Sequence, residues 1–163
     1  MIKDIFIKET KGKGKGVFAL RSFKKGEFIF RFKKGKIVKR KDISKLSKED
    51  QEHLNEIIDK DTYEIQRPPE RFLNHSCDSN AIAKGRTLFA LKLIRKGEEI
   101  TVDYRINAHD KQKLKCKCGS KNCTGIVILD FFSLSEKLQK KYLLYAPKFI
   151  QEEYNKRHKE SRN

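Results

Sequence analysis

The four cysteines constrain the fold of this chain more than any other feature of its sequence. Three follow the spacing C-x-C-x4-C at Cys116, Cys118 and Cys123, and the fourth, Cys77, stands alone near the middle of the chain. Structural zinc is nearly always tetrahedral, with cysteine or histidine ligands. Four cysteines complete one such site, so the sequence predicts a zinc ion that holds Cys77 beside residues 116–123.

Two other interpretations of the cysteines stay open on the sequence alone. A disulfide is disfavoured because such bonds are rare inside cells and a bridge within C-x-C would be strained. Four free thiols are the simpler alternative, although three clustered cysteines with neighbouring glycines are uncommon by chance.

The length and composition indicate one folded domain. The chain has 163 residues, of which 37% are hydrophobic and 37% charged, and its 11 Phe and 5 Tyr can build a core that a disordered chain would lack. Its apolar runs are shorter than the roughly 20 residues that span a bilayer, and its first residues do not resemble a signal peptide. We therefore expect an intracellular protein without membrane contact.

The net charge of +17 is concentrated at the two ends of the chain. Residues 1–45 carry 16 Lys and Arg against 4 Asp and Glu, whereas residues 46–132 carry 15 against 14. Such a field attracts polyanions, so nonspecific nucleic-acid contact through the N-terminal third is one interpretation. The alternative is a surface that is basic for solubility, since no zinc-finger spacing, helix-turn-helix or RNP pattern is present.

Short apolar bursts separated by glycine and lysine predict a chain of short strands. They lie at residues 5–7, 16–20, 27–32, 36–38, 80–85, 86–93 and 99–104.

Helices are predicted in three places. The first covers residues 47–60, which have a capping pair at their start and Leu54, Ile57 and Ile58 on one face. Ser133 with Glu136 predicts a second helix, to about residue 145. Pro147 can begin a third, which carries Phe149, Ile150 and Tyr154. We expect residues 156–163 to be frayed. The fold class is therefore mostly β, or α+β, with a small helical insert and a helical C-terminus.

Four segments, in this order, resemble the SET-domain protein lysine methyltransferases with their post-SET zinc-binding segment: GKGKGVFA (12–19), RFLNHSCDSN (71–80), GEEITVDY (97–104) and CKCGSKNCTG (116–125). On its own the glycine loop is weak evidence for a phosphate or cofactor site, because it matches neither G-x-x-x-x-G-K-[ST] nor G-x-G-x-x-G before a helix. The resemblance implies a SET fold over residues 1–113, a post-SET segment over 114–127 and a C-terminal helical extension over 128–163.

The resemblance also implies roles for individual residues. The cofactor S-adenosylmethionine would be held by Gly14, Lys15, Gly16, Val17, Phe18, Asn74, His75 and Tyr104. Tyr104 would be catalytic, Tyr63 would line the lysine channel, and Cys77, Cys116, Cys118 and Cys123 would bind zinc. Arg71, Asn80 and Glu99 also match and are interpreted as scaffold, whereas His53, His109 and His158 are expected at the surface.

The chemistry agrees with these roles. Methyl transfer to lysine needs a neutral, desolvated amine aimed at the methyl carbon, and a narrow apolar channel lowers the amine's pKa. A tyrosine hydroxyl can orient that amine without any side-chain nucleophile. Considered singly, Asn74 could bond a turn, His75 could be an interior histidine and Tyr104 a core residue.

Three positions depart from the family pattern. Ser79 stands where proline is usual, residues 32–35 read Phe-Lys-Lys-Gly in place of Y-x-G, and Val102 occupies a position that is often aromatic. Cofactor contacts near residue 32 and the number of methyl groups added are therefore not fixed by the motif.

The resemblance implies an S-adenosylmethionine-dependent protein lysine methyltransferase with a histone or another basic, chromatin-associated protein as substrate. Such an enzyme is expected in the nucleus, on chromatin, if the source is eukaryotic, and in the cytoplasm otherwise. Alternatives are a methyltransferase for a non-histone protein, such as a ribosomal protein, and a non-catalytic SET-like binding module with nucleic-acid affinity. The retained Asn74, His75 and Tyr104 favour an enzyme.

Overall fold

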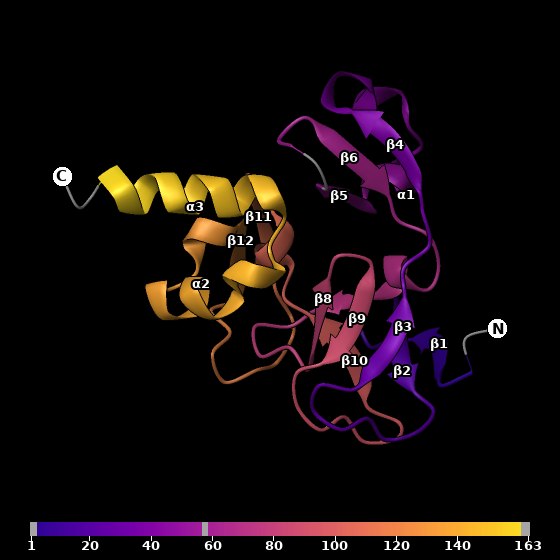
Figure 1. Ribbon diagram of the computed structural model, residues 1–163. Helices are drawn as coiled ribbons and strands as arrows, with labels where there is room; N and C mark the ends of the chain where they lie inside the picture. The colour runs from indigo at the N-terminus through magenta and orange to yellow at the C-terminus, as the bar shows by residue number, and fades with distance from the viewer. Residues whose placement is uncertain (1–2, 57–58, 161–163) are drawn as a thin grey trace. The chain divides into compact units, whose positions relative to one another are not determined.

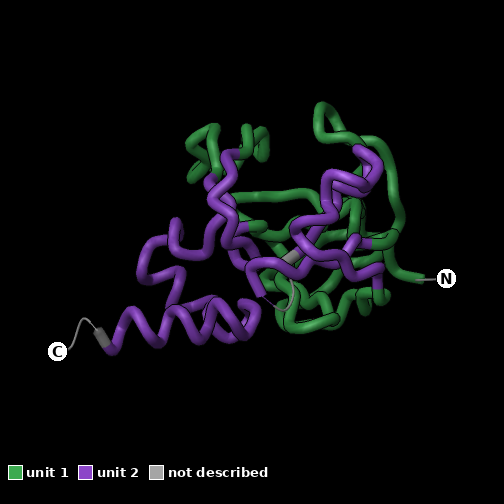
Figure 2. The backbone as a smooth tube through the Cα atoms, turned by 90° about the horizontal axis from the view of Figure 1, so that it is seen from above, with its two compact units in different colours: residues 1–34, 67–104, 114–127 green, residues 35–66, 105–113, 128–163 purple. Residues whose placement is uncertain are grey.

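The computed structural model describes residues 3–56 and 59–160, which form two compact units (Figure 2). Unit 1 comprises residues 1–34, 67–104 and 114–127, and unit 2 comprises residues 35–66, 105–113 and 128–163. Each unit therefore contains segments that are distant in the sequence.

Unit 1 is built on a four-stranded sheet in the order β1 (Ile5–Glu9), β2 (Lys15–Ala19), β10 (Glu99–Val102) and β7 (Asn74–His75) (Figure 1). The first three strands pair antiparallel, whereas β10 and β7 run parallel with Thr101 opposite Asn74. The sheet thus brings the glycine turn between β1 and β2, the segment around residue 74 and the end of β10 next to one another.

A second, antiparallel sheet in unit 1 follows the order β3 (Phe28–Arg31), β9 (Thr87–Ala90) and β8 (Ala81–Lys84). Large apolar side chains from both sheets form one core cluster, which includes Val17, Phe23, Phe30, Leu88 and Ile100. Burial of these side chains is the main source of the unit's stability.

One part of unit 2 is an antiparallel sheet in the order β4 (Lys36–Lys39), β6 (Thr62–Ile65) and β5 (Leu54–Glu56). Between β4 and β5 lie the 3-10 turn η1 (Arg40–Lys45) and the short helix α1 (Lys48–Gln51). Val38, Tyr63 and Ile65 form its small core.

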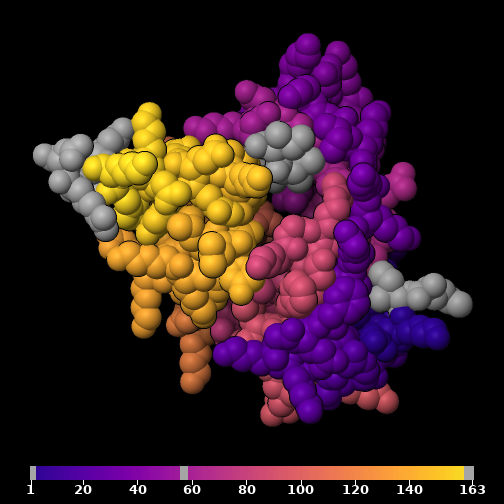
Figure 3. All heavy atoms as spheres, in the orientation of Figure 1, coloured from indigo at the N-terminus to yellow at the C-terminus, as the bar shows by residue number. Residues whose placement is uncertain are grey.

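The C-terminal part of the fold contains the two-stranded sheet of β11 (His109–Lys115) and β12 (Ile126–Asp130). The helices α2 (Glu136–Tyr142) and α3 (Lys148–Glu160) follow, joined through η5 (Leu143–Tyr145), and Figure 3 shows their atoms as a continuous orange to yellow mass. Phe131 and Ile150 are fully buried in this region, and the ring of Phe131 meets that of Tyr154 edge-on.

The remaining 3-10 turns are η2 (Glu70–Phe72), η3 (Tyr104–Asn107) and η4 (Phe131–Ser133). In the described ranges, no helix combines the length and the apolar character that crossing a membrane requires.

The predicted strands are all present, but the helix predicted over residues 47–60 is wrong. Ser47 does cap a helix, accepting a hydrogen bond from the backbone N–H of Asp50, yet α1 ends at Gln51. Residues 54–56 instead pair with β6, where Leu54 packs on the small core of unit 2. Sheet pairing therefore overrides the helical periodicity, and Ile57 and Ile58 lie outside the described residues.

Two predictions about the C-terminal helices need correction. The N-cap position of α2 is Ser135, whose side chain makes no capping hydrogen bond. The hydroxyl of Ser133 is directed away from the helix, 2.7 Å from the carbonyl of Asp130 and 3.0 Å from that of Ile128, and shares its one proton between them. The helix expected after Pro147 is present, but it continues to Glu160, so the predicted fraying does not hold for residues 156–160. Residues 161–163 lie outside the described part of the chain.

Candidate active site and metal centre

Glycine in the β1–β2 hairpin, in the turn and at the start of β2, lets the backbone run close to side chains of β10 and β7. A methyl group built on Gly16 would lie 2.6 Å from Cγ2 of Thr10, 2.8 Å from Oε1 of Glu99 and 3.1 Å from Nδ2 of Asn74. Gly14 is required for a different reason, because its φ of +66° is in the left-handed region. The turn is thus shaped by glycine at both positions.

The other residues predicted to hold the cofactor around this turn have different surroundings. Lys15 is exposed with its ammonium 5.4 Å from the centre of the Phe72 ring. Val17 is fully buried in the core of unit 1, and the buried ring of Phe18 lies under the ammonium of Lys8.

Asn74 lies directly beside the turn. Its Nδ2 donates to the carbonyl of Lys15 at 3.0 Å and to Oε1 of Glu99 at 2.7 Å. The other carboxylate oxygen of Glu99 pairs with the ammonium of Lys13 at 2.6 Å. The sequence analysis missed Lys13 and interpreted Glu99 as scaffold. No sequence pattern links the two residues, because they meet only when the β1–β2 hairpin pairs with β10.

His75 is a buried link between Tyr104 and the cysteines. Its Nδ1 accepts a hydrogen bond from the backbone N–H of Tyr104 at 3.2 Å, so the proton belongs on Nε2, which faces Sγ of Cys77 at 3.4 Å. The carboxylate of Asp103 lies 3.6 Å from Nδ1, and the two side chains are only 4% and 5% exposed. This geometry fixes the ring and its tautomer.

The hydroxyl of Tyr104 donates to the carbonyl of Leu73 at 2.6 Å, where β10 ends beside β7. Desolvation, and then the negative charge of Glu99, raise the pKa of Tyr104 to about 12, although a hydrogen bond with the His75 backbone acts in the opposite direction. The phenol is therefore neutral at physiological pH, with its proton committed to a carbonyl and its oxygen lone pairs available as acceptors.

Tyr63, predicted to line a lysine channel, belongs to the other compact unit. It lies on β6 in the small core with Val38 and Ile65, and its hydroxyl donates to the carbonyl of Lys60 at 3.3 Å. The guanidinium of Arg40 lies 5.2 Å from its ring centre. Its role in substrate binding stays a prediction.

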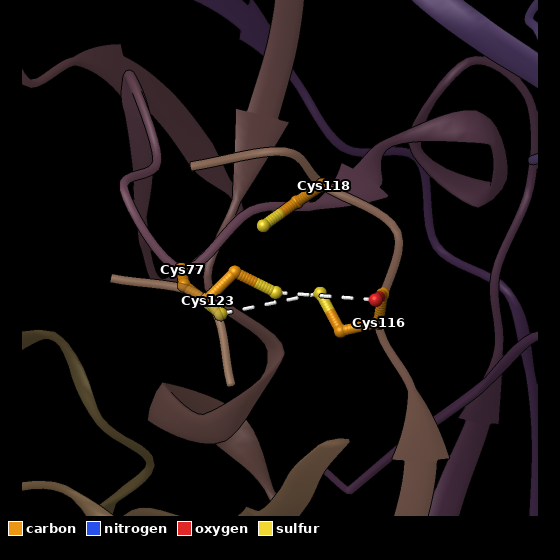
Figure 4. Close-up of side chains that lie close together, drawn as sticks. All are labelled: Cys77, Cys116, Cys118 and Cys123. Carbon is orange, nitrogen blue, oxygen red and sulfur yellow. Dashed lines mark hydrogen bonds between the residues drawn. The ribbon is translucent and has the colours of Figure 1, made fainter. Parts of the chain in front are cut away.

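The four cysteines come together, as the sequence predicts, and their sulfur atoms point toward one another (Figure 4). All four sulfurs lie within 4.8 Å of one another, and those of Cys77 and Cys116 are 4.0 Å apart. Tetrahedral zinc with Zn–S bonds near 2.3 Å separates its sulfurs by about 3.8 Å. The donor set and spacing therefore fit a four-thiolate zinc site.

Tight turns shape the segment that carries three of these cysteines. The carbonyl of Gly125 accepts from the backbone N–H of Cys116 at 2.8 Å, and the backbone N–H of Cys123 donates to the carbonyl of Ser120 at 3.0 Å. Gly119 and Gly125 have φ of +70° and +79°. The segment thus folds back on itself and presents its thiols to Cys77.

The cysteine thiols influence one another's ionisation. Burial, followed by the charges of Cys116 and Cys118, raises the pKa of Cys77. Desolvation also opposes ionisation of Cys118, but hydrogen bonds, with Ser120 first, outweigh it and lower the pKa of Cys118 to about 5. Four thiolates at this spacing repel, so a divalent cation would stabilise the arrangement.

His109 was expected at the surface, and this expectation is wrong. Its side chain is only 7% exposed, with Nδ1 3.3 Å from Asp130 and Nε2 3.2 Å from Glu153, so it joins β11 and β12 to α3 within unit 2. The sequence around residue 109 is polar, and residues distant in sequence bury the ring: Asp130 and Phe132 on one part of the chain, and Phe149 and Glu153 of α3.

The residues of this site lie in the part of the chain that matches a known protein family. Residues 14–105, which contain the glycine turn, Asn74, His75 and Tyr104, match the SET domain family. The chain therefore belongs to the SET domain family.

Individual relatives share the greater part of this chain. It is 34% identical over 142 residues to a histone-lysine N-methyltransferase, H3 lysine-36 specific, of Saccharomyces cerevisiae, covering 76% of this chain and 19% of that protein. It is 29% identical over 160 residues to an H3 lysine-9 specific histone-lysine N-methyltransferase of Neurospora crassa, covering 71% and 48%. This chain thus spans only part of these relatives.

The fold is also found in a solved structure. The methyltransferase domain of human histone-lysine N-methyltransferase SETMAR superposes with a TM-score of 0.60 at 23% identity, covering 77% of this chain and 58% of that chain. The SET fold expected from the sequence motifs is thereby confirmed, and the division at residues 113 and 127 stays a prediction.

Proposed function

We propose that this chain is an S-adenosylmethionine-dependent protein lysine N-methyltransferase. The observation that carries the proposal is that one sheet brings the close backbone at Gly16 next to the amide of Asn74, with the neutral hydroxyl of Tyr104 held just after the end of β10 by the Leu73 carbonyl. Two relatives of this chain are named histone-lysine N-methyltransferases.

The residues of the turn suit an amino-acid cofactor. A methyl group added to Gly16 would run into Thr10, Glu99 and Asn74, whereas one added to Gly14 would meet no atom of the described residues within 4 Å. A bound molecule can therefore approach the main chain at Gly14. S-adenosylmethionine, when bound, supplies a methyl group on a positively charged sulfonium. Asn74 would hold its amino-acid end, and the backbone around His75 its adenine.

Tyr104 would position the substrate amine. Because its proton is donated to Leu73, its oxygen accepts a hydrogen bond from an amine N–H and so directs the nitrogen lone pair. With a pKa of about 12, the hydroxyl is too weakly acidic to be ionised and act as a base near pH 8. The lysine must therefore arrive neutral, having lost its proton to water.

We propose that zinc occupies the four-cysteine cluster and is structural. Four thiolates would complete its coordination and leave no position for water, so the ion would not take part in methyl transfer. It would hold residues 116–123 against Cys77 and, through His75, next to Tyr104.

The substrate we propose is a histone, in chromatin. The named relatives act on histone H3 at lysine-36 or lysine-9, which supports the protein class. The 16 basic residues among the first 45 would add salt-sensitive, nonspecific contact with nucleic acid.

The substrate class can be tested by competition. The chain is incubated with labelled S-adenosylmethionine and equal masses of core histones and ribosomal proteins, and labelled bands are mapped by mass spectrometry. We expect one histone lysine to carry the label. Label confined to ribosomal proteins would favour the non-histone alternative, and labelling of neither by folded, zinc-loaded protein would favour a binding module.

A further inference from the structure

An ion pair within unit 1 contacts the Asn74 amide. Lys13, from the β1–β2 turn, contacts Oε2 of Glu99 on β10 at 2.6 Å, and Oε1 of the same carboxylate accepts from Asn74 at 2.7 Å. The side chains of Lys13 and Glu99 are 22% and 20% exposed. The pair is thus shielded from solvent more than the exposed ion pairs of the surface.

The hydrogen-bond inventory of Asn74 shows what this contact achieves. An amide nitrogen has two hydrogens, and those of Asn74 go to the Lys15 carbonyl and to Glu99. Flipping the amide would turn its oxygen toward two other acceptors, which is unfavourable. The acceptor Oδ1 is therefore the part of the side chain left for a ligand.

Lys13 holds the Glu99 carboxylate in the orientation in which it accepts the hydrogen bond from Asn74. Unpaired, Glu99 would place a negative charge next to the turn, free to rotate toward another donor. The ammonium of Lys13 anchors Oε2, which leaves Oε1 directed at Asn74.

We propose that Lys13 and Glu99 are a positioning pair for cofactor binding: they hold the Asn74 amide so that its oxygen receives the ammonium of an α-amino-acid group. The inference rests on the proposed function and deepens it, since it assigns to two residues outside the ligand contacts a share of the affinity for the cofactor. If the pair had a purely structural role, it would only stabilise the packing of the β1–β2 hairpin against β10.

The test is calorimetric titration with S-adenosylhomocysteine, which has the same amino-acid end, with thermal unfolding measured alongside. Glu99→Ala should lower affinity roughly 10-fold or more, the effect of one charge-assisted hydrogen bond. Lys13→Gln should lower it by about 3- to 10-fold, and Lys13→Arg should restore most of it. Lys92→Gln, which breaks the exposed Lys92–Asp78 pair of 2.8 Å in the same unit, should leave it unchanged.

A charge-reversed double variant distinguishes orientation of the Asn74 amide from simple stabilisation of the β1–β2 hairpin against β10. Lys13→Glu with Glu99→Lys restores an ion pair, but it places an ammonium donor against the Asn74 donor. We expect the melting temperature to recover and the affinity to stay low, whereas recovery of both would overturn the inference.

The proposed function has a separate failure. If the unmodified chain does not bind S-adenosylhomocysteine, the cofactor assignment itself is contradicted. If the unmodified chain binds it and Glu99→Ala binds equally well, the positioning inference alone is contradicted.

Discussion

Replacement of Gly16 by alanine should weaken cofactor binding through crowding alone. The added methyl group would lie 2.8 Å from Oε1 of Glu99, and an ordinary contact requires the carboxylate to withdraw by about 0.6 Å. That shift lengthens the 2.7 Å hydrogen bond to Asn74 to as much as about 3.3 Å and so weakens it. Complete loss of one charge-assisted hydrogen bond costs about 1.5–3 kcal/mol, so the affinity should fall by up to roughly 10- to 100-fold.

The control for this variant is Gly26→Ala, also in unit 1. The φ of Gly26 is +81°, and its added methyl group would meet no atom of the described residues within 4 Å. Its cost is backbone strain of about 1–2 kcal/mol, which lowers the melting temperature by several degrees without changing ligand affinity. Calorimetric titration with S-adenosylhomocysteine checks both variants, and a wild-type affinity for Gly16→Ala would refute the reasoning.

Four other expectations concern metal, packing and pH. Metal analysis should find roughly one zinc per chain in the wild type and little or none in Cys116→Ser, and full retention by the variant would contradict the four-thiolate site. Ile150→Ala, at a fully buried position, should lower the free energy of unfolding in denaturant by about 2–5 kcal/mol. Leu144→Ala, at a position that is 74% exposed, should lower it by about 0.5 kcal/mol or less. Although desolvation opposes it, the cations around Glu153 lower its pKa from the ordinary 4.5, so its stabilisation is complete above that pH and lost below it. Melting curves of Glu153→Gln and wild type should therefore converge in acid, and a constant difference would refute this. With its pKa near 12, Tyr104 should cause no decline of methyl transfer between about pH 8 and 10, so a falling limb there in a pH–rate profile would count against its neutrality.

The sequence predicted well those features that depend on local pattern or on donor chemistry. Alternating apolar bursts predicted the strands of unit 1 because each strand buries side chains in the adjoining core. Cys77 could be paired with residues 116–123 by cysteine counting alone, since three thiols require a fourth ligand and one cysteine was left.

Features that depend on long-range pairing could not be predicted in this way. Residues 54–56 have helical periodicity, yet their pairing with β6 decides their conformation. His109 is buried by residues distant in sequence, among them Phe132 and, from α3, Glu153. Lys13 meets Glu99 because β2 pairs with β10. Tertiary contacts override local preference at these positions.

The most direct test of the account is methyl transfer by the wild type and by Tyr104→Phe. Labelled transfer from S-adenosylmethionine to core histones is measured at saturating cofactor, with Tyr142→Phe as the matched tyrosine variant in the C-terminal helices. The account predicts that wild type and Tyr142→Phe label one histone, while Tyr104→Phe falls roughly 100-fold or more with its fold retained. Equal labelling by Tyr104→Phe, or no labelling by folded wild type, would contradict it.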